Sequence, residues 1–264
     1  MKDVVKKIIK FDFTPTIIFY VLFMVLTGLL VYVDTQPVGW GKSMIGLASI
    51  NRPVFDYIGK SLLWYNITEI LGKIAILYMI GFAIYGLVQW VDRHKLKRVD
   101  KDLFVLAFIY VLIAVCYVIF EIFIVNFRPV LVNIEPEASY PSSHTMLVVC
   151  VMATSIMQFH NKMKKKALRI VMEIVSVIIM VVTVVGRLLS GVHWLTDILG
   201  ALLLSATLIS FYYALVKRIN KYGKSISKKK KTKNKKSNKE IREKRKAKRV
   251  EKAKKRKKAQ EEKE

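Results

Sequence analysis

The chain has 264 residues, 53% of them hydrophobic, and a formal net charge of +26. Soluble domains rarely combine so much apolar content with so much charge, so we expect the two to be segregated along the sequence. Residues 217–264 carry a net charge of +19, whereas residues 1–216 carry only +7. This distribution excludes a uniformly basic soluble domain and predicts two parts with a boundary at residue 216.

The first part contains six apolar runs, each long enough for a membrane-spanning helix, which needs roughly 20 residues. A further apolar stretch, 43–65, is interrupted by Asp56 and Lys60, so an interfacial helix or packed loop is favoured over a seventh span. The sequence therefore predicts an all-α bundle of six transmembrane helices, followed by a Lys-rich tail. The predicted spans are 16–33, 68–91, 103–125, 142–159, 169–185 and 197–216.

Lys and Arg residues gather in alternate segments outside these spans. The N-terminal segment carries four of them, and the segments 92–102 and 160–169 carry five each. Loops rich in Lys and Arg stay on the cytoplasmic side of a membrane. We therefore expect a multi-pass protein of the cell membrane with both termini in the cytoplasm and the other helix ends facing outside.

Polar residues cluster at the helix ends on the predicted outer side. Arginine side chains offer planar sets of donors that match phosphate oxygens. A helix that begins at Ser142 or Ser143 adds unpaired backbone N–H groups and the positive end of its dipole. These features predict a phosphate site. Its candidate residues are Arg128, Ser142, Ser143, His144, Arg187, His193 and Asp197.

Two histidines supply the reactive groups of this cluster. His193 and Asp197 are four residues apart, so on a helix they share a face and the carboxylate can hold one ring nitrogen protonated. The other nitrogen is then free to attack a phosphorus atom, while His144 protonates the departing oxygen and later activates water. This set suffices for phosphoryl transfer through a phosphohistidine, and we expect neither a metal nor a cofactor.

These residues resemble the three motifs of the type 2 phosphatidic acid phosphatase family, the integral-membrane lipid phosphate phosphatases. The family pattern is Lys-x6-Arg-Pro, then Pro-Ser-Gly-His, then Ser-Arg-x5-His-x3-Asp. The corresponding segments begin at Glu121, Pro141 and Gly186 and place the motifs within 121–197. The resemblance extends over about residues 68–216.

The resemblance implies a role for each matching residue. It makes His193 the nucleophile, Asp197 the residue that orients it and His144 the general acid. It also implies a metal-independent hydrolase that acts on a lipid phosphate or pyrophosphate, and undecaprenyl pyrophosphate, phosphatidic acid and phosphatidylglycerophosphate all fit. The implied phosphate ligands are Arg128, Arg187, Ser142 and the backbone of Ser143.

Three positions depart from the family pattern. Ser143 replaces a Gly, Gly186 replaces a Ser, and Glu121 replaces a Lys, which alone reverses a charge. Lys73 lies at a similar depth in the second span, so we hypothesise a Glu121–Lys73 pair that lets Lys73 supply the missing positive charge. A pair that serves only helix packing, or a protonated Glu121, is the alternative. A catalytically impaired family member that binds lipid phosphates or acts as a scaffold is the alternative function.

The tail, 217–264, is predicted to be largely disordered or a solvated charged helix. Its basic residues would attract anionic lipids of the inner leaflet by roughly 1 kcal/mol for each residue held near the surface. No aromatic residue follows Tyr222, so base stacking is absent. Any nucleic-acid binding by the tail would therefore be electrostatic and non-specific, and we do not expect it to be the main function.

Overall fold

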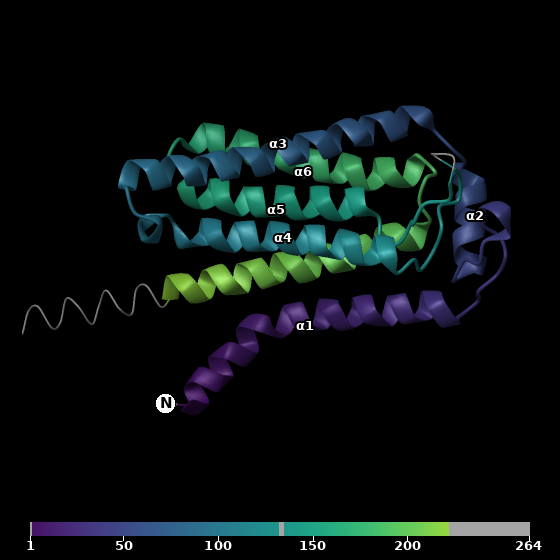
Figure 1. Cartoon of the computed structure of the whole chain (residues 1–264), viewed down its shortest axis with the longest axis horizontal. Coiled ribbons are helices and arrows are strands. Elements are labelled where there is room, and N and C mark those ends of the chain that lie inside the picture. The colour runs from purple at the N-terminus through teal and green to yellow at the C-terminus, as the bar shows by residue number, and fades with distance from the viewer. Residues whose placement is uncertain (1, 132–134, 222–264) are drawn as a thin grey trace, which may run out of the picture. The chain divides into compact units, whose positions relative to one another are not determined.

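The computed structural model describes residues 2–131 and 135–221 (Figure 1). These residues form helices and no β-strand, apart from two isolated β-bridges. Five helical segments are long and apolar enough to cross a membrane, so the protein is an all-α, multi-pass membrane protein. They are Phe13–Tyr32 within α1 (Lys2–Tyr32), α3 (Leu62–Arg93), α4 (Lys101–Ile122), α6 (Lys166–Leu189) and the C-terminal helix Leu195–Lys221.

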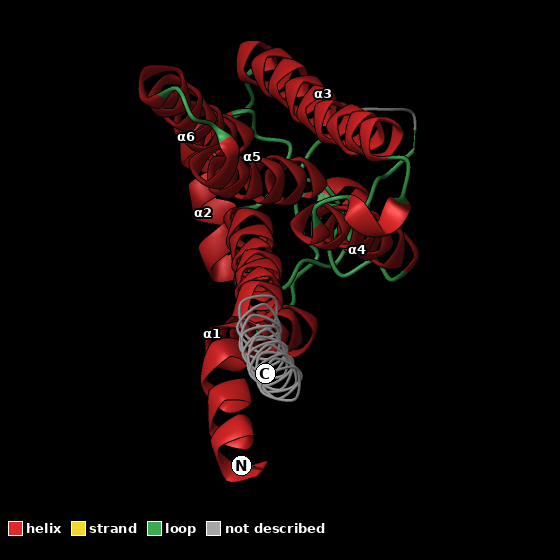
Figure 2. Ribbon diagram, turned by 90° about the vertical axis from the view of Figure 1, so that its left-hand side faces the viewer, coloured by secondary structure: helices red, strands yellow, loops and turns green. Residues whose placement is uncertain are grey.

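The fourth predicted span, 142–159, corresponds to α5 (Ser143–Lys162), which is not among the five. This helix packs against α6, α3 and α4, near the centre of the bundle in Figure 2. Its polar side chains find partners on neighbouring helices: Gln158 donates to the Tyr212 hydroxyl at 2.6 Å, and Thr154 lies 3.3 Å from that of Tyr110. A helix enclosed by other helices does not need an apolar surface for lipid. Six spans remain a prediction.

A short helix, α2 (Ala48–Ile58), lies across one end of the bundle (Figure 1). Its 11 residues are too few to cross a bilayer, which agrees with the prediction of no span at 43–65. The buried Asn51 side chain donates to the Thr196 hydroxyl at 2.9 Å and accepts from the Thr196 N–H at 3.2 Å. The Phe55 and Trp194 rings lie 5.5 Å apart. These contacts tie α2 to the start of the C-terminal helix.

The opposite end of the bundle is held by an ionic cluster. Lys162 contacts Asp100 at 2.7 Å and Asp102 at 3.0 Å, and Arg93 contacts Asp100 at 2.8 Å. Partial burial raises the pKa of Asp100, but hydrogen bonds from Lys162, Arg93 and Gln89 outweigh this effect and hold the pKa at about 2. Asp100 therefore stays charged and joins the ends of α3, α4 and α5.

The chain divides into two compact units, Met1–Val216 and Lys217–Glu264. Of the second unit the structure describes only residues 217–221, which end the C-terminal helix. The rest of the predicted tail, 222–264, lies outside the described residues, and its lipid binding stays a prediction.

A tight turn between α6 and the C-terminal helix sets the position of His193. Gly191 has a φ of +68°, and a Cβ atom there would lie 2.1 Å from the carbonyl oxygen of Gly59. The Ser61 N–H donates to the Ser190 carbonyl at 3.2 Å, which brings the start of α3 against the same turn. Only glycine combines this backbone conformation with this close approach.

Gly191→Ala should therefore lower the free energy of unfolding by about 1–3 kcal/mol or more, because the added Cβ meets both strain and a clash. Thermal unfolding of the detergent-solubilised protein measures the effect. Gly81→Ala is the matched control, since a Cβ atom at Gly81 meets nothing within 4 Å. An unfolding temperature that falls equally in both variants, or in neither, would contradict this account of the turn.

Candidate active site

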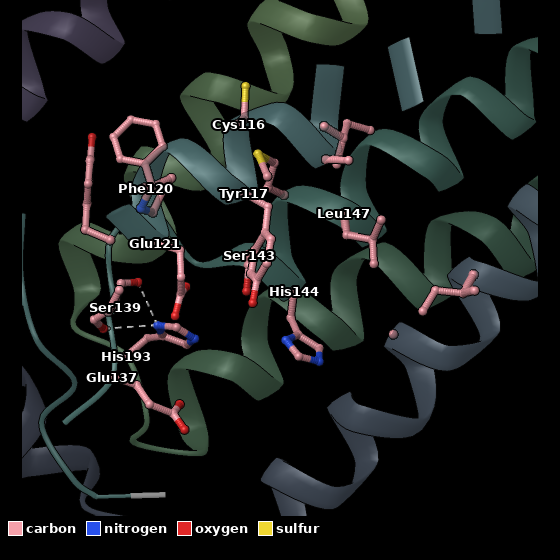
Figure 3. Close-up of a pocket in the computed structure, with 18 of the residues that line it drawn as sticks. Cys116, Tyr117, Phe120, Glu121, Glu137, Ser139, Ser143, His144, Leu147 and His193 are labelled. Atoms are coloured by element: carbon pink, nitrogen blue, oxygen red, sulfur yellow. Dashed lines mark hydrogen bonds between the residues drawn. The ribbon is translucent and has the colours of Figure 1, made fainter. Parts of the chain in front are cut away.

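His193 is buried in the turn before the C-terminal helix, and its Nδ1 faces Ser139 (Figure 3). Nδ1 lies 3.1 Å from the Ser139 carbonyl oxygen and 3.2 Å from the Ser139 hydroxyl. A carbonyl oxygen only accepts, so Nδ1 carries the proton and Nε2 is unprotonated. Burial, reinforced by the charges of Arg187 and Arg128, lowers the pKa of His193 well below its usual value. The ring is therefore neutral near neutral pH, with Nε2 available as a nucleophile.

Asp197, predicted to orient His193 directly, acts through an intermediary. Its Oδ2 lies 3.7 Å from His193 Nδ1, which is too far for a hydrogen bond. The Ser139 hydroxyl lies between them and donates to Oδ2, which also accepts from the Trp194 N–H at 2.8 Å. Ser139 thus completes the support of His193. Sequence reasoning missed it because a lone serine ahead of the Pro141 motif carries no distinctive pattern.

Arg187 is fully buried and joins the two histidines. Its Nη2 donates to His144 Nδ1 at 3.3 Å and to His193 Nε2 at 3.4 Å. Its Nη1 donates to the Glu69 carboxylate at 3.2 Å and to the Thr68 hydroxyl at 3.3 Å. The guanidinium therefore connects residues of α3, α5 and the turn after α6.

The remaining predicted phosphate ligands lie in two environments. Arg128 and Ser143 line a cavity beside His144, and Arg128 pairs with Glu137 at 3.0 Å. Ser142 is buried and is not among the residues that line this cavity. Its side chain caps α5, and its N–H donates to the Asp197 carbonyl at 3.1 Å. The structure therefore brings together every predicted residue but places Ser142, Arg187 and Asp197 behind the cavity wall.

The cavity has a volume of about 630 Å³ and lies between α3, α4, α5 and the loop that precedes α5. Polar and charged side chains, His144 and His193 among them, line one part of this cavity (Figure 3). Apolar side chains line the rest. A second cavity of about 210 Å³ lies between α3 and α4, and the two cavities share Met79 and Tyr110 as lining residues. The apolar wall of the first cavity includes Ile76, Met79, Ile113, Ala114, Phe120, Met146 and Leu147.

Lys73 and Glu121 line the first cavity from α3 and α4. The hypothesised ion pair between them is not present in the described part of the chain, where neither side chain takes part in a salt bridge. Similar depth in two helices does not bring two side chains together, because the cavity separates α3 from α4 at this level. Both charges therefore face the space in which a ligand would bind.

Comparisons with known proteins identify this arrangement. Residues 102–221 match the model of the PAP2 superfamily. The fold is similar to that of the first transmembrane PAP2 type phosphatidylglycerolphosphate phosphatase from Bacillus subtilis, with a TM-score of 0.58 and 15% sequence identity over 77% of this chain and 96% of that chain. We call residues 102–221, which match this family model, the PAP2 domain.

The predicted family resemblance is thereby confirmed. All seven predicted site residues lie inside the PAP2 domain, whereas Thr68, Glu69 and Lys73 precede the matched region. No curated protein matches the chain. The similarity to the solved phosphatase establishes the fold and leaves the substrate of this protein open.

Arg187→Met should lower the free energy of unfolding by about 3 kcal/mol, because it leaves the Glu69 carboxylate without its buried partner. Adding Glu69→Gln should recover part of this loss, since the second change removes the unpaired charge. Denaturant unfolding of the two single variants and the double variant measures the coupling. Strictly additive losses would show that the Arg187–Glu69 contact contributes nothing to stability.

Proposed function

We propose that this protein is a membrane lipid phosphate or pyrophosphate phosphatase that works through a phosphohistidine at His193. The observation that carries this proposal is that one cavity combines a polar part with an apolar part. Its polar part presents both histidines, and its apolar part runs between α3 and α4. A phosphate that carries a long hydrocarbon chain matches both parts.

The contacts of Arg187 support a two-step reaction. A phosphate oxygen that enters between the histidines takes over the Arg187 donors, which frees Nε2 of His193 to attack phosphorus. The bond to the leaving oxygen breaks as His144 donates a proton to that oxygen. His144 then accepts a proton from a water molecule that attacks the phosphohistidine, and inorganic phosphate is released. The PAP2 domain supplies both histidines from the chain itself, and metal-independent turnover is part of the proposal.

Three substrates stay in the proposal: undecaprenyl pyrophosphate, phosphatidic acid and phosphatidylglycerophosphate. The solved relative is described as a phosphatidylglycerolphosphate phosphatase, which makes this lipid the first to test. The positions of the basic segments support an active site on the outer face, with both termini and the tail in the cytoplasm. On the cytoplasmic side, the basic residues of the tail would contact anionic lipids of the inner leaflet.

A catalytically impaired family member that binds lipid phosphates is the second candidate. Glu121 supports it, because it places a negative charge where the family has a positive one. The pairing of both arginines with carboxylates supports it too, since Arg187 contacts Glu69 and Arg128 contacts Glu137. Measurement of turnover separates the two candidates.

Purified protein in detergent and chelator should release phosphate from at least one of the three lipids, and His193→Ala should lower the rate at least about 10³-fold. His160→Ala is the matched control, because this exposed histidine pairs with Glu173 near the opposite ends of α5 and α6. It should retain the full rate. No turnover of any of the three lipids would favour the second candidate, whereas turnover that survives His193→Ala would contradict a phosphohistidine at His193.

Lys73→Ala should lower kcat/KM at least about tenfold, because a charged hydrogen bond to the phosphate contributes about 1.5 kcal/mol or more. Lys73→Arg should retain most of the activity. Glu121→Lys restores the family residue inside the same cavity and should lower KM, since it replaces a repelling charge by an attracting one. Unchanged kinetics in Lys73→Ala would show that Lys73 does not contact the phosphate.

A further inference from the structure

Glu69 is a carboxylate that the family motifs do not contain. It lies on α3, before the PAP2 domain, and lines the cavity with its side chain 28% exposed. A single oxygen, Oε1, lies 3.1 Å from His144 Nε2 and 3.2 Å from Arg187 Nη1. Gly72, one turn further along α3, leaves room for the ring: a Cβ atom there would lie 2.9 Å from His144 Cδ2.

The partners of His144 determine which ring nitrogen carries its proton. Arg187 can only donate, so Nδ1 of His144 accepts from it and carries no hydrogen. The carboxylate of Glu69 accepts, so the proton lies on Nε2. His144 is therefore held as one tautomer, with Nδ1 facing Arg187.

The two histidines are supported in parallel ways. Ser139 and Asp197 support His193 through Nδ1, and its Nε2 faces Nη2 of Arg187. Glu69 holds His144 through Nε2, and the Nδ1 of that ring faces the same Nη2 atom. Both rings thus direct their unprotonated nitrogen toward the guanidinium of Arg187, so a phosphoryl group bound by that guanidinium would lie beside both nitrogens. One ring can then attack phosphorus while the other protonates the leaving oxygen.

We propose that Glu69 is a positioning residue for the general acid His144. It holds Nε2–H so that the proton for the leaving oxygen is carried on Nδ1, and its charge stabilises the imidazolium form. His144 gives the Nδ1 proton to the departing alkoxide and returns to the neutral Nε2–H tautomer. It regains a proton on Nδ1 from the water that attacks the phosphohistidine. This role rests on the proposed function, because it concerns the proton transfer of that reaction.

Glu69→Gln tests the role through the leaving group. A lipid phosphate leaves as an alkoxide that needs a proton, whereas p-nitrophenyl phosphate releases a stable phenolate without one. Glu69→Gln should lower kcat for the lipid phosphate about 100-fold and change kcat for p-nitrophenyl phosphate only a few-fold, since general acid catalysis contributes roughly 10² or more. Equal losses on both substrates, or no loss on the lipid, would overturn the proposal.

Glu173→Gln is the matched control for this experiment. Glu173 also contacts a histidine and an arginine, His160 at 3.3 Å and Arg169 at 3.7 Å, but near the opposite ends of α5 and α6. Its substitution should leave the ratio of the two kcat values unchanged. A ratio that shifts as much in Glu173→Gln as in Glu69→Gln would also overturn the proposal.

A second measurement uses the wild-type protein, so it depends neither on turnover nor on whether Glu69→Gln folds. Nitrogen-15 NMR of the four histidines, with His144 assigned from its absence in His144→Gln, should show the Nε2–H tautomer for His144. An Nδ1–H tautomer in active protein would overturn the role of Glu69 alone. Absence of phosphate release from every substrate would instead overturn the proposed function, and this role with it.

Discussion

The buried guanidinium of Arg187 is the group on which the rest of the site depends. A charge removed from water is costly unless it is paired and hydrogen-bonded. Glu69 supplies the opposite charge and Thr68 accepts a hydrogen bond, both at Nη1, and the two histidines accept from Nη2. Because these partners come from α3, α5 and the turn after α6, Nη1 and Nη2 find their partners only when those elements meet at one end of the bundle.

Close packing around Arg187 explains the small residues nearby. A Cβ atom at Gly186 would lie 2.7 Å from Thr68 Cγ2, and a Cβ atom at Gly72 would lie 2.9 Å from His144 Cδ2. Glycine at these positions lets α3 approach α6 and α5 closely enough for the guanidinium to reach its partners. The position where the family has a serine is therefore occupied here by a residue that brings two helices together.

The sequence predicts the helices well and the support of the site poorly. Apolar runs predict the five candidate spans to within six residues, because a helix in lipid must be long and apolar. The Arg and His spacings predict which side chains meet. Ser139 and Glu69 could not be predicted, since each contacts a residue far along the chain and belongs to no local pattern. The predicted Glu121–Lys73 pair was wrong because similar depth along two helices does not fix the distance between them, and a cavity lies between α3 and α4 here. Ser142 forms the N-cap of α5 and does not line the cavity.

The central claim is that His193 carries the phosphoryl group during the reaction. The most direct measurement is mass spectrometry and phosphorus-32 labelling of protein quenched in alkali during turnover of a radiolabelled lipid phosphate. We expect a base-stable, acid-labile phosphoryl group on the peptide that contains His193, and its absence in His193→Gln. Phosphate release at the wild-type rate from His193→Gln, or a label that persists on another residue of that variant, would contradict the account.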